Sequence, residues 1–446
     1  MLNTDKLFKA AKAAGIDVFE ARIGSQSKLS VAMFDNELEN YTVADDGVFK
    51  VRGLVDGKCG VFTSDRADDE VIDVAIAALK ESAEYGNLLD SEFFIDGTKY
   101  KYEKVDTYHD GLAHISADKF IAAAKTVAER TLAADKRIEH VNVSLEYSDV
   151  TQRLINSKGL DVTSRANFAL IFADVKATDG KEVQSGSHYE IISDFDAFDA
   201  DAFVKTLTDD ALKQLGGGSV ETGKYDVVYS PDCVATLVQS LCAGFSAFDA
   251  EQHMSLLEGK MGEQVFSPLF NVDQTPIGDE VFCSPFDDEG VPCKNMPLID
   301  KGVPTGFVYD LETAKRAGVA STGNGKLVGG NMRPSVGYVT VKNGDMSQDE
   351  VFAAVGDGLY ITELGGAHAG LDRQSGNYSL QASGFVIKNG KLDRPASLIT
   401  VAGNIMTDFA NVKAVGNDAK LTYFEVKAPS VAISGVSVSG VKPEAE

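Results

Sequence analysis

The sequence has no tryptophan, only five cysteines and no long hydrophobic run, and each shortage excludes a class of protein. The cysteines are odd in number and form no CxxC pair, which excludes a disulfide scaffold and favours reduced thiols in a cytoplasm. No stretch of about 18 apolar residues could span a bilayer. The opening stretch MLNTDKLFKAAKAAG lacks the apolar core and cleavage site of a signal peptide. We therefore expect a cytoplasmic protein.

Basic residues are also scarce. The chain has 42 lysines and arginines against 67 aspartates and glutamates, a net charge of −25. Binding to nucleic acid requires a basic surface that displaces phosphate counterions, and no cluster of Lys or Arg supplies one. An anionic membrane surface is disfavoured as a partner for the same reason. We expect neutral or cationic partners.

Several familiar catalytic motifs are missing. None of the six histidines forms an HExxH or HExxxH pattern, which would place two imidazoles and a glutamate on one helix face. The acidic segment at 194–201 lacks the glycine of an EF-hand loop. The segment STGNGKL at 321–327 lacks two residues of a phosphate loop, and no GxSxG occurs. From these patterns we predict no catalytic residue and no metal ligand on this chain.

The order of periodic segments predicts an α+β fold. Apolar residues recur at helical spacing over 117–134, and the period then changes to two, which indicates an antiparallel meander between Val141 and Asp179. The triple glycine at 216–218 is the best domain boundary. We predict a mixed α/β N-terminal region over 1–218, in which residues 1–110 come first and residues 111–218 form the central portion. A C-terminal domain rich in antiparallel sheet is expected over 219–446.

What the chain does have is a glycine-rich segment between Ile361 and Asn404. Its order is strand, glycine-rich loop, strand, turn at Asn389-Gly390, strand. A polar set lies on or beside this loop: Thr362, Glu363, His368, Asn377, Tyr378 and Ser379. These side chains could close the loop by hydrogen bonds. Alternatively, they could line a groove for a peptide that adds to a sheet edge.

Four further blocks accompany that segment in order. They are the R-x-G…G-V-F pattern within 21–61, SPFDDEGVP at 284–292, LIDKGVPTGFVYDLETAKRAG at 298–318 and STGNG at 321–325. Together with the glycine-rich segment they resemble the TldD/TldE (PmbA) family of bacterial and archaeal peptidases. The resemblance covers most of the chain and implies an activity connected with proteolysis.

One branch of that family, TldD, resembles a metallopeptidase with HExxxH early in the C-terminal domain and a cysteine ligand near the C-terminus. The matching region here is Thr236–His253, which we predict to be one helix. Between Leu237 and Asp249 it has neither His nor Glu, and no cysteine follows Asn404. The chain therefore resembles the TldE/PmbA branch. The resemblance implies a non-catalytic subunit that holds unfolded peptide beside a TldD-like partner, which would carry the zinc ion and the catalytic Glu.

Two alternatives remain open on the sequence. The chain could be a stand-alone homodimeric protein that binds peptides without cleaving them. It could also be a divergent peptidase that uses His368 or Cys242 without a metal. The family's older label, modulator of DNA gyrase, gains no support from a charge of −25.

Overall fold

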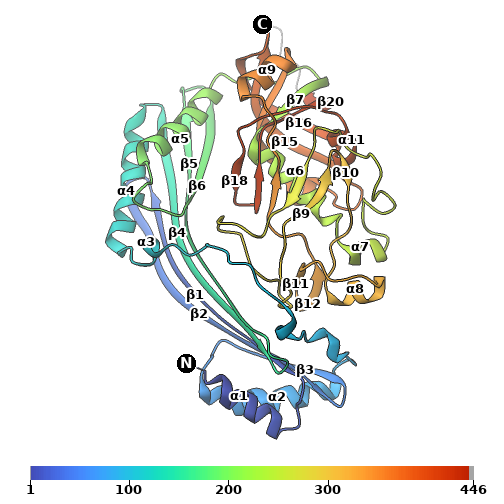
Figure 1. Cartoon of the computed structure of the whole chain (residues 1–446). Coiled ribbons are helices and arrows are strands. Elements are labelled where there is room, and N and C mark those ends of the chain that lie inside the picture. Colours follow the sequence, from blue (N-terminus) through green and yellow to red (C-terminus); the bar gives the residue numbers. More distant parts are fainter. Residues whose placement is uncertain (1, 441–446) are drawn as a thin grey trace.

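The structure is a computed structural model that describes residues 2–440, and it shows two lobes joined along one side (Figure 1). The N-terminal lobe is built on a six-stranded antiparallel sheet in the order β3-β2-β1-β4-β5-β6. Its strands are β1 Phe19–Phe34, β2 Glu37–Val55, β3 Lys58–Ser64, β4 Ile138–Asn156, β5 Asp161–Thr178 and β6 Val183–Ile192. The predicted meander is confirmed by the order β4-β5-β6.

Helices cover one face of this sheet. They are α1 Thr4–Ala13, α2 Ile72–Tyr85, α3 Asp110–Ala113, α4 Ala117–Ala134 and α5 Ala200–Gln214, with the 3-10 turn η1 Asp69–Val71. The 3-10 turns η2 Ser91–Phe93 and η3 Gly97–Lys99 belong to a segment that packs on the opposite face, where Ile95 contacts Leu154 and Phe286. Alternate residues of β4, such as Val143 and Leu145, share a core with Phe120 of α4 and Phe203 of α5. The helices α1 and α2 pack at the other end of the sheet (Figure 1). The rest of the opposite sheet face is therefore left to the C-terminal lobe.

The first and central portions of the N-terminal region share this one sheet. Strand β1 pairs with β4 from Glu20 to Phe34, so segments far apart in sequence are joined through backbone hydrogen bonds. The division at residue 110 thus separates two halves of one sheet.

The C-terminal lobe contains a strongly curved sheet in the order β16-β15-β14-β7-β20-β17, in which β16 also pairs with β20. That extra pairing closes five of the strands into a ring. The strands are β7 Gly223–Tyr229, β14 Gly358–Gly365, β15 Asn377–Lys388, β16 Lys391–Asn404, β17 Val412–Val415 and β20 Val431–Gly440. All pairings here are antiparallel except β7 with β14.

A second sheet packs beside it in the order β10-β9-β8-β13-β19-β18. Its strands are β8 Val272–Gln274, β9 Met296–Asp300, β10 Val303–Pro304, β13 Val339–Val341, β18 Lys420–Thr422 and β19 Val426–Ala428, and β11 Gly325–Val328 pairs separately with β12 Asn331–Pro334. The helices are α6 Pro231–Ala243, α7 Ala247–Glu251, α8 Leu311–Ala317, α9 Gln348–Val355, α10 Ala367–Gly370 and α11 Ile405–Ala410. The predicted α+β class is confirmed.

The predicted single helix over Thr236–His253 is wrong. Helix α6 ends at Ala243, and α7 begins only at Ala247. The break arises because Gly244 caps α6 and the Ser246 side chain accepts a hydrogen bond from the amide of Asp249, which starts a new helix. The chain therefore turns at the point where a longer helix was expected.

The loop SPFDDEGVP joins the two lobes. Asp288 accepts a 2.6 Å hydrogen bond from Arg22 of β1 and a 2.8 Å bond from the amide of Leu327. The Tyr102 hydroxyl donates to the carbonyl of Gly290 at 2.8 Å. These contacts fix the relative position of the lobes near the base of the sheet. Within residues 2–440, no helix is long and apolar enough to cross a membrane.

Candidate functional site

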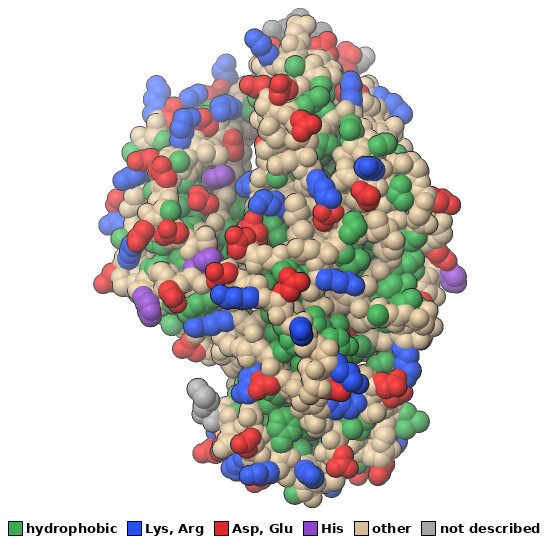
Figure 2. Space-filling model, viewed as in Figure 1, with side chains coloured by type: hydrophobic (Ala, Val, Ile, Leu, Met, Phe, Trp, Pro, Cys, Tyr) green, Lys and Arg blue, Asp and Glu red, His purple; other side chains and the backbone are tan. Residues whose placement is uncertain are grey.

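A cavity of about 580 Å³ lies between the lobes, where Figure 2 shows the surface hollowed. We call it the interdomain cleft. One wall is formed by the edge strand β6 and by α5, and the other by the start of α6 together with β14, β15 and β18. Five consecutive residues of β6, Ser185–Tyr189, line the cleft. Within residues 2–440, no strand pairs with the outer edge of β6, so this backbone edge faces the cavity.

The two walls touch at one polar contact. The Tyr189 hydroxyl donates a short hydrogen bond to Asp232, at the start of α6. Lys420 lies 3.2 Å from the other oxygen of Asp232 and 4.2 Å from the centre of the Tyr189 ring. Since this carboxylate and this ammonium group neutralise each other, the contact closes the cleft on one side without an unpaired charge.

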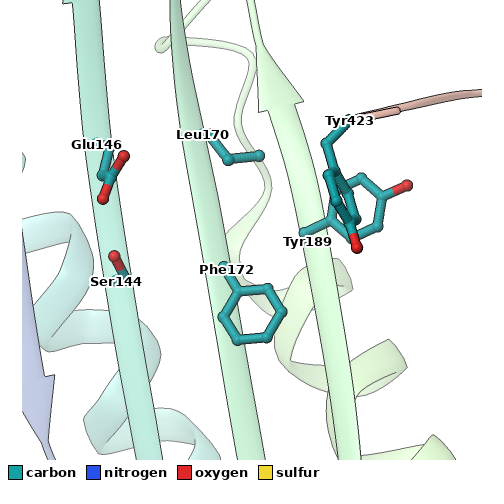
Figure 3. A pocket seen from close by; sticks show the side chains of 6 residues that line it. All are labelled: Ser144, Glu146, Leu170, Phe172, Tyr189 and Tyr423. Carbon is teal, nitrogen blue, oxygen red and sulfur yellow. The ribbon is translucent and has the colours of Figure 1, made fainter. Parts of the chain in front are cut away.

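An aromatic surface extends from this contact over the open face of the N-terminal sheet. It forms a shallow cavity of about 350 Å³ lined by Leu170, Phe172, Tyr189 and Tyr423, with Ser144 and Glu146 at its rim (Figure 3). The rings of Tyr189 and Tyr423 meet edge to face, with centroids 5.0 Å apart. We call these four apolar residues the aromatic shelf. Such a surface can bind apolar side chains without selecting one sequence.

Two titratable groups on the N-terminal wall of the cleft, His188 and Asp210, are shifted toward their neutral forms. Burial, together with the nearby Lys420, lowers the pKa of His188 to about 4, so the imidazole is neutral at pH 7. Burial raises the pKa of Asp210 on α5 above its usual value. The side-chain oxygen of Gln214, a buried residue of the same wall, has no hydrogen-bond partner. This wall of the cleft thus presents the neutral imidazole of His188 beside polar side chains and Lys213.

A second cavity, of about 510 Å³, follows the exposed side of α6. We call it the α6 groove. Gln239 and Cys242 of α6 line it, together with Ser246, which caps α7, and Asp249 of α7. The opposite side carries Arg333, which stacks 3.9 Å from the ring centre of Phe248. Phe424 lines both this groove and the interdomain cleft, so the Tyr423–Phe424 dipeptide separates them.

Models of a known protein family match three parts of this chain. The PmbA/TldA metallopeptidase domain 1 matches residues 19–83, the central domain matches 110–215, and the C-terminal domain matches 222–440. The chain belongs to the PmbA/TldD/TldE family.

Individual family members match along almost the whole chain. The metalloprotease PmbA of Escherichia coli O157:H7 is 24% identical over 440 residues, which cover 95% of this chain and 92% of that protein. A Thermotoga maritima protein described as a candidate modulator of a DNA gyrase is 28% identical, with a TM-score of 0.90 and coverage of 98% and 99%. TldE from Thermococcus kodakarensis shares the fold, with a TM-score of 0.89 at 21% identity and coverage of 98% and 100%.

The metallopeptidase descriptions of this PmbA/TldD/TldE family raise the question of whether α6 fits a zinc ion. Its groove side presents the Gln239 amide and the Cys242 thiol, and burial raises the pKa of this thiol to about 12, so it stays protonated. His253, beyond α7, is exposed and lies 2.7 Å from Glu258. Across residues 2–440, no three His, Cys, Asp or Glu side chains are arranged to hold a metal ion. The residues present do not fit zinc.

The six predicted peptide-binding residues lie in three different places. Thr362 and Glu363 line the interdomain cleft, at a bulge where the pairing of β14 with β15 shifts register. His368 on α10 is exposed, as are Asn377 and Ser379 at the start of β15, and none of these three lines the cleft.

The sixth residue, Tyr378, points into the core of the C-terminal lobe, because side chains alternate along the strand. Only Thr362 and Glu363 are thus brought together in one cavity. For the exposed residues, a peptide-binding role stays a prediction.

Sequence reasoning missed the residues that shape the cleft: Phe172, Tyr189, Asp232, Lys420 and Tyr423. One signal was present. Phe172 is an aromatic residue at a position that alternates with the buried residues Ile171 and Ala173, so it lies on the open face of β5. The remaining residues come together only through the packing of distant segments.

Proposed function

We propose that this chain is the non-catalytic, TldE/PmbA-like subunit of a cytoplasmic TldD/TldE-type zinc metallopeptidase. In this role it holds unfolded peptide for proteolysis or peptide maturation, and a TldD-like partner supplies the zinc ion and the general base. The observation that carries the proposal is the α6 groove. It has the size of a ligand site, yet the side chains of Gln239 and Cys242, which α6 presents to it, suit neither zinc binding nor proton transfer at neutral pH.

The interdomain cleft supports the peptide-holding role. An extended peptide can pair with the backbone of an unpaired edge strand, and this adds affinity without selecting a sequence. The edge of β6 faces the cleft, and the aromatic shelf lies beside it. Thr362 and Glu363 on the opposite wall would contact the same peptide. These features favour an unfolded segment over a compact small molecule.

The test is purification of the chain together with a partner that carries HExxxH. We expect a stable one-to-one complex that contains zinc, whereas the chain purified alone contains none in stoichiometric amount. The proposal is overturned if the chain alone binds one zinc ion per molecule and cleaves peptide in a chelator-sensitive manner.

The same assay distinguishes the alternatives. A stand-alone homodimer would bind peptide with no TldD-like partner encoded in the genome. A metal-independent peptidase would cleave peptide in the presence of chelator and lose that activity in His368→Ala. No specific contact of His368 favours this last possibility, since it lies on the surface outside the cleft.

A further inference from the structure

The outer edge of β2 is open over Glu37–Asp46. Strand β1 pairs with β2 along nearly its whole length, whereas β3 pairs only with 49–55 on the other side. No other strand within residues 2–440 pairs with β2. The opening ends near Gly47, where the backbone of Asp65 approaches so closely that an added Cβ would lie 2.4 Å from its oxygen. We call residues 37–46 the β2 edge.

This edge is exposed on both faces and carries large apolar side chains. Every residue from Glu37 to Val43 is exposed, and Leu38, Tyr41 and Val43 have exposed fractions of 48%, 41% and 60%. Their partners in β1 are Met33, Val31 and Leu29, which belong to or pack against the core under α4. The apolar face of the N-terminal sheet therefore extends beyond the helices that cover it. It ends at the β2 edge, whose backbone pairs with no further strand within residues 2–440.

The charges of the edge are of one sign. The segment ELENYTVADD contains Glu37, Glu39, Asp45 and Asp46 and no basic residue. Two copies paired antiparallel would bring the acids at one end opposite those at the other, and parallel pairing would stack identical acids. Like charges on facing strands are destabilising, so a second copy is disfavoured. The same acids attract a strand that carries Lys or Arg.

The edge is also held in place before any partner arrives. At the hairpin tip, Asp35 accepts a 2.9 Å hydrogen bond from the amide of Val141, and its own amide donates to the carbonyl of Val141 at 2.8 Å. The other Asp35 oxygen lies 3.0 Å from His140 Nδ1, and the His140 ring stacks on Phe34. Since the strand is already ordered, a partner strand would not bear the cost of ordering it.

We propose that the β2 edge is a docking site for an extended strand of a partner protein whose side chains alternate between basic and apolar residues. The strand would extend the N-terminal sheet beyond β2. On the face that packs under α4, its apolar side chains would cover Leu38, Tyr41 and Val43, and on the other face its basic side chains would lie near Glu37 and Asp46. This surface lies on the opposite edge of the sheet from β6, so the proposal does not depend on peptide binding in the interdomain cleft.

The test uses the full chain and a labelled peptide of about ten residues in which lysine alternates with valine. We expect it to bind and to slow hydrogen exchange at the amides of 37–46. The variant Tyr41→Lys/Val43→Lys should weaken binding by at least about tenfold, because it removes apolar contact and adds repulsion. Its matched control is Val74→Lys, since Val74 is 58% exposed on helix α2, away from both edge strands. That control should bind as the unchanged chain does.

Two further peptides separate strand pairing from simple charge attraction. A version with glutamate in place of lysine should not slow hydrogen exchange at 37–46. A version N-methylated at alternate residues keeps its charge but cannot pair as a strand, and it should also leave these amides unprotected. The proposal is overturned if the methylated peptide protects 37–46 equally well. Protection of the cleft in place of 37–46, or self-association of the chain through 37–46, would overturn it too.

Discussion

The Tyr378 hydroxyl donates a 2.6 Å hydrogen bond to Asp408, and both side chains are buried in the C-terminal lobe. The Tyr229 hydroxyl lies 3.2 Å from the same phenol oxygen. Strand β15, the end of β7 and helix α11 are thus tied together beneath the strands that form the cleft wall. Tyr378 therefore supports the position of that wall from within the core.

Removing the Tyr378 hydroxyl is expected to destabilise the fold. In Tyr378→Phe, Asp408 loses its donor while it remains buried, which costs roughly 1–3 kcal/mol in the free energy of unfolding. Urea unfolding measures this loss. The control is Tyr423→Phe, whose ring is half exposed, and its change should be within about 0.5 kcal/mol. Equal losses in the two variants would contradict the assignment of Tyr378 to the core.

The contribution of two buried carboxyls, Asp287 and Glu289, to stability is expected to fall as the pH rises above about 5. Burial raises the pKa of Glu289 to about 9 and that of Asp287 to about 7. The folded state therefore binds more protons than the unfolded state between the ordinary carboxyl pKa and these values. The stabilisation from these two carboxyls is complete below their pKa in the unfolded chain. It is lost as the pH rises through their pKa in the folded chain.

Glu289→Gln should reduce this loss, because the amide resembles the protonated acid at every pH and can still accept the hydrogen bond from Leu311. We expect similar stability at pH 5 and a gain of at least about 1 kcal/mol at pH 9 relative to the unchanged chain. Thermal unfolding at both pH values provides the measurement, and Glu139→Gln, at an exposed position, is the control. A gain in stability of the same size at pH 5 and pH 9 would contradict a raised pKa of Glu289 in the folded state.

The ion pair between Arg22 and Asp288 is expected to matter more than a surface pair. Its side chains are 16% and 23% exposed, against 37% and 57% for Arg153 and Asp161. Arg22→Met should cost about 2 kcal/mol in the free energy of unfolding, since it leaves Asp288 partly buried without its partner. Arg153→Met should cost at most about 1 kcal/mol. Urea unfolding of both variants measures the two losses. A larger loss in Arg153→Met than in Arg22→Met would contradict this expectation.

The aromatic shelf is expected to contribute to peptide binding. Phe172→Ala and Tyr423→Ala should each weaken binding of an unfolded peptide by about tenfold, because each removes a large apolar contact. Tyr85→Ala, at an exposed aromatic outside the cleft, should leave binding unchanged. Fluorescence anisotropy of a labelled peptide measures all three. If the shelf variants bind as tightly as Tyr85→Ala, the peptide does not contact the shelf.

Local patterns in the sequence predict local structure well. The turn at Asn389-Gly390 has both residues at positive φ, as a type I′ hairpin requires. The helix over 117–134 has the bounds that its periodicity predicts. These features depend only on residues that are neighbours in the sequence, so the sequence alone is enough to predict them.

The candidate site is different, because distant segments create it. Nothing near Tyr189 in the sequence indicates that Asp232 and Lys420 will meet it. The glycine-rich segment does contribute Thr362 and Glu363 to the cleft. Strand alternation, however, sends Tyr378 to the opposite side from Asn377 and Ser379. The segment was therefore a good guide to the region and a poor guide to its individual residues.

The most direct test of the account is the rate of peptide cleavage by this chain alone, by an HExxxH-bearing partner alone, and by the two together, with zinc counted in each sample. We predict cleavage by the complex, loss of that cleavage with chelator or when the partner's general-base Glu is replaced by Gln, and neither zinc nor cleavage with this chain alone. Zinc-dependent cleavage by this chain alone would contradict the account.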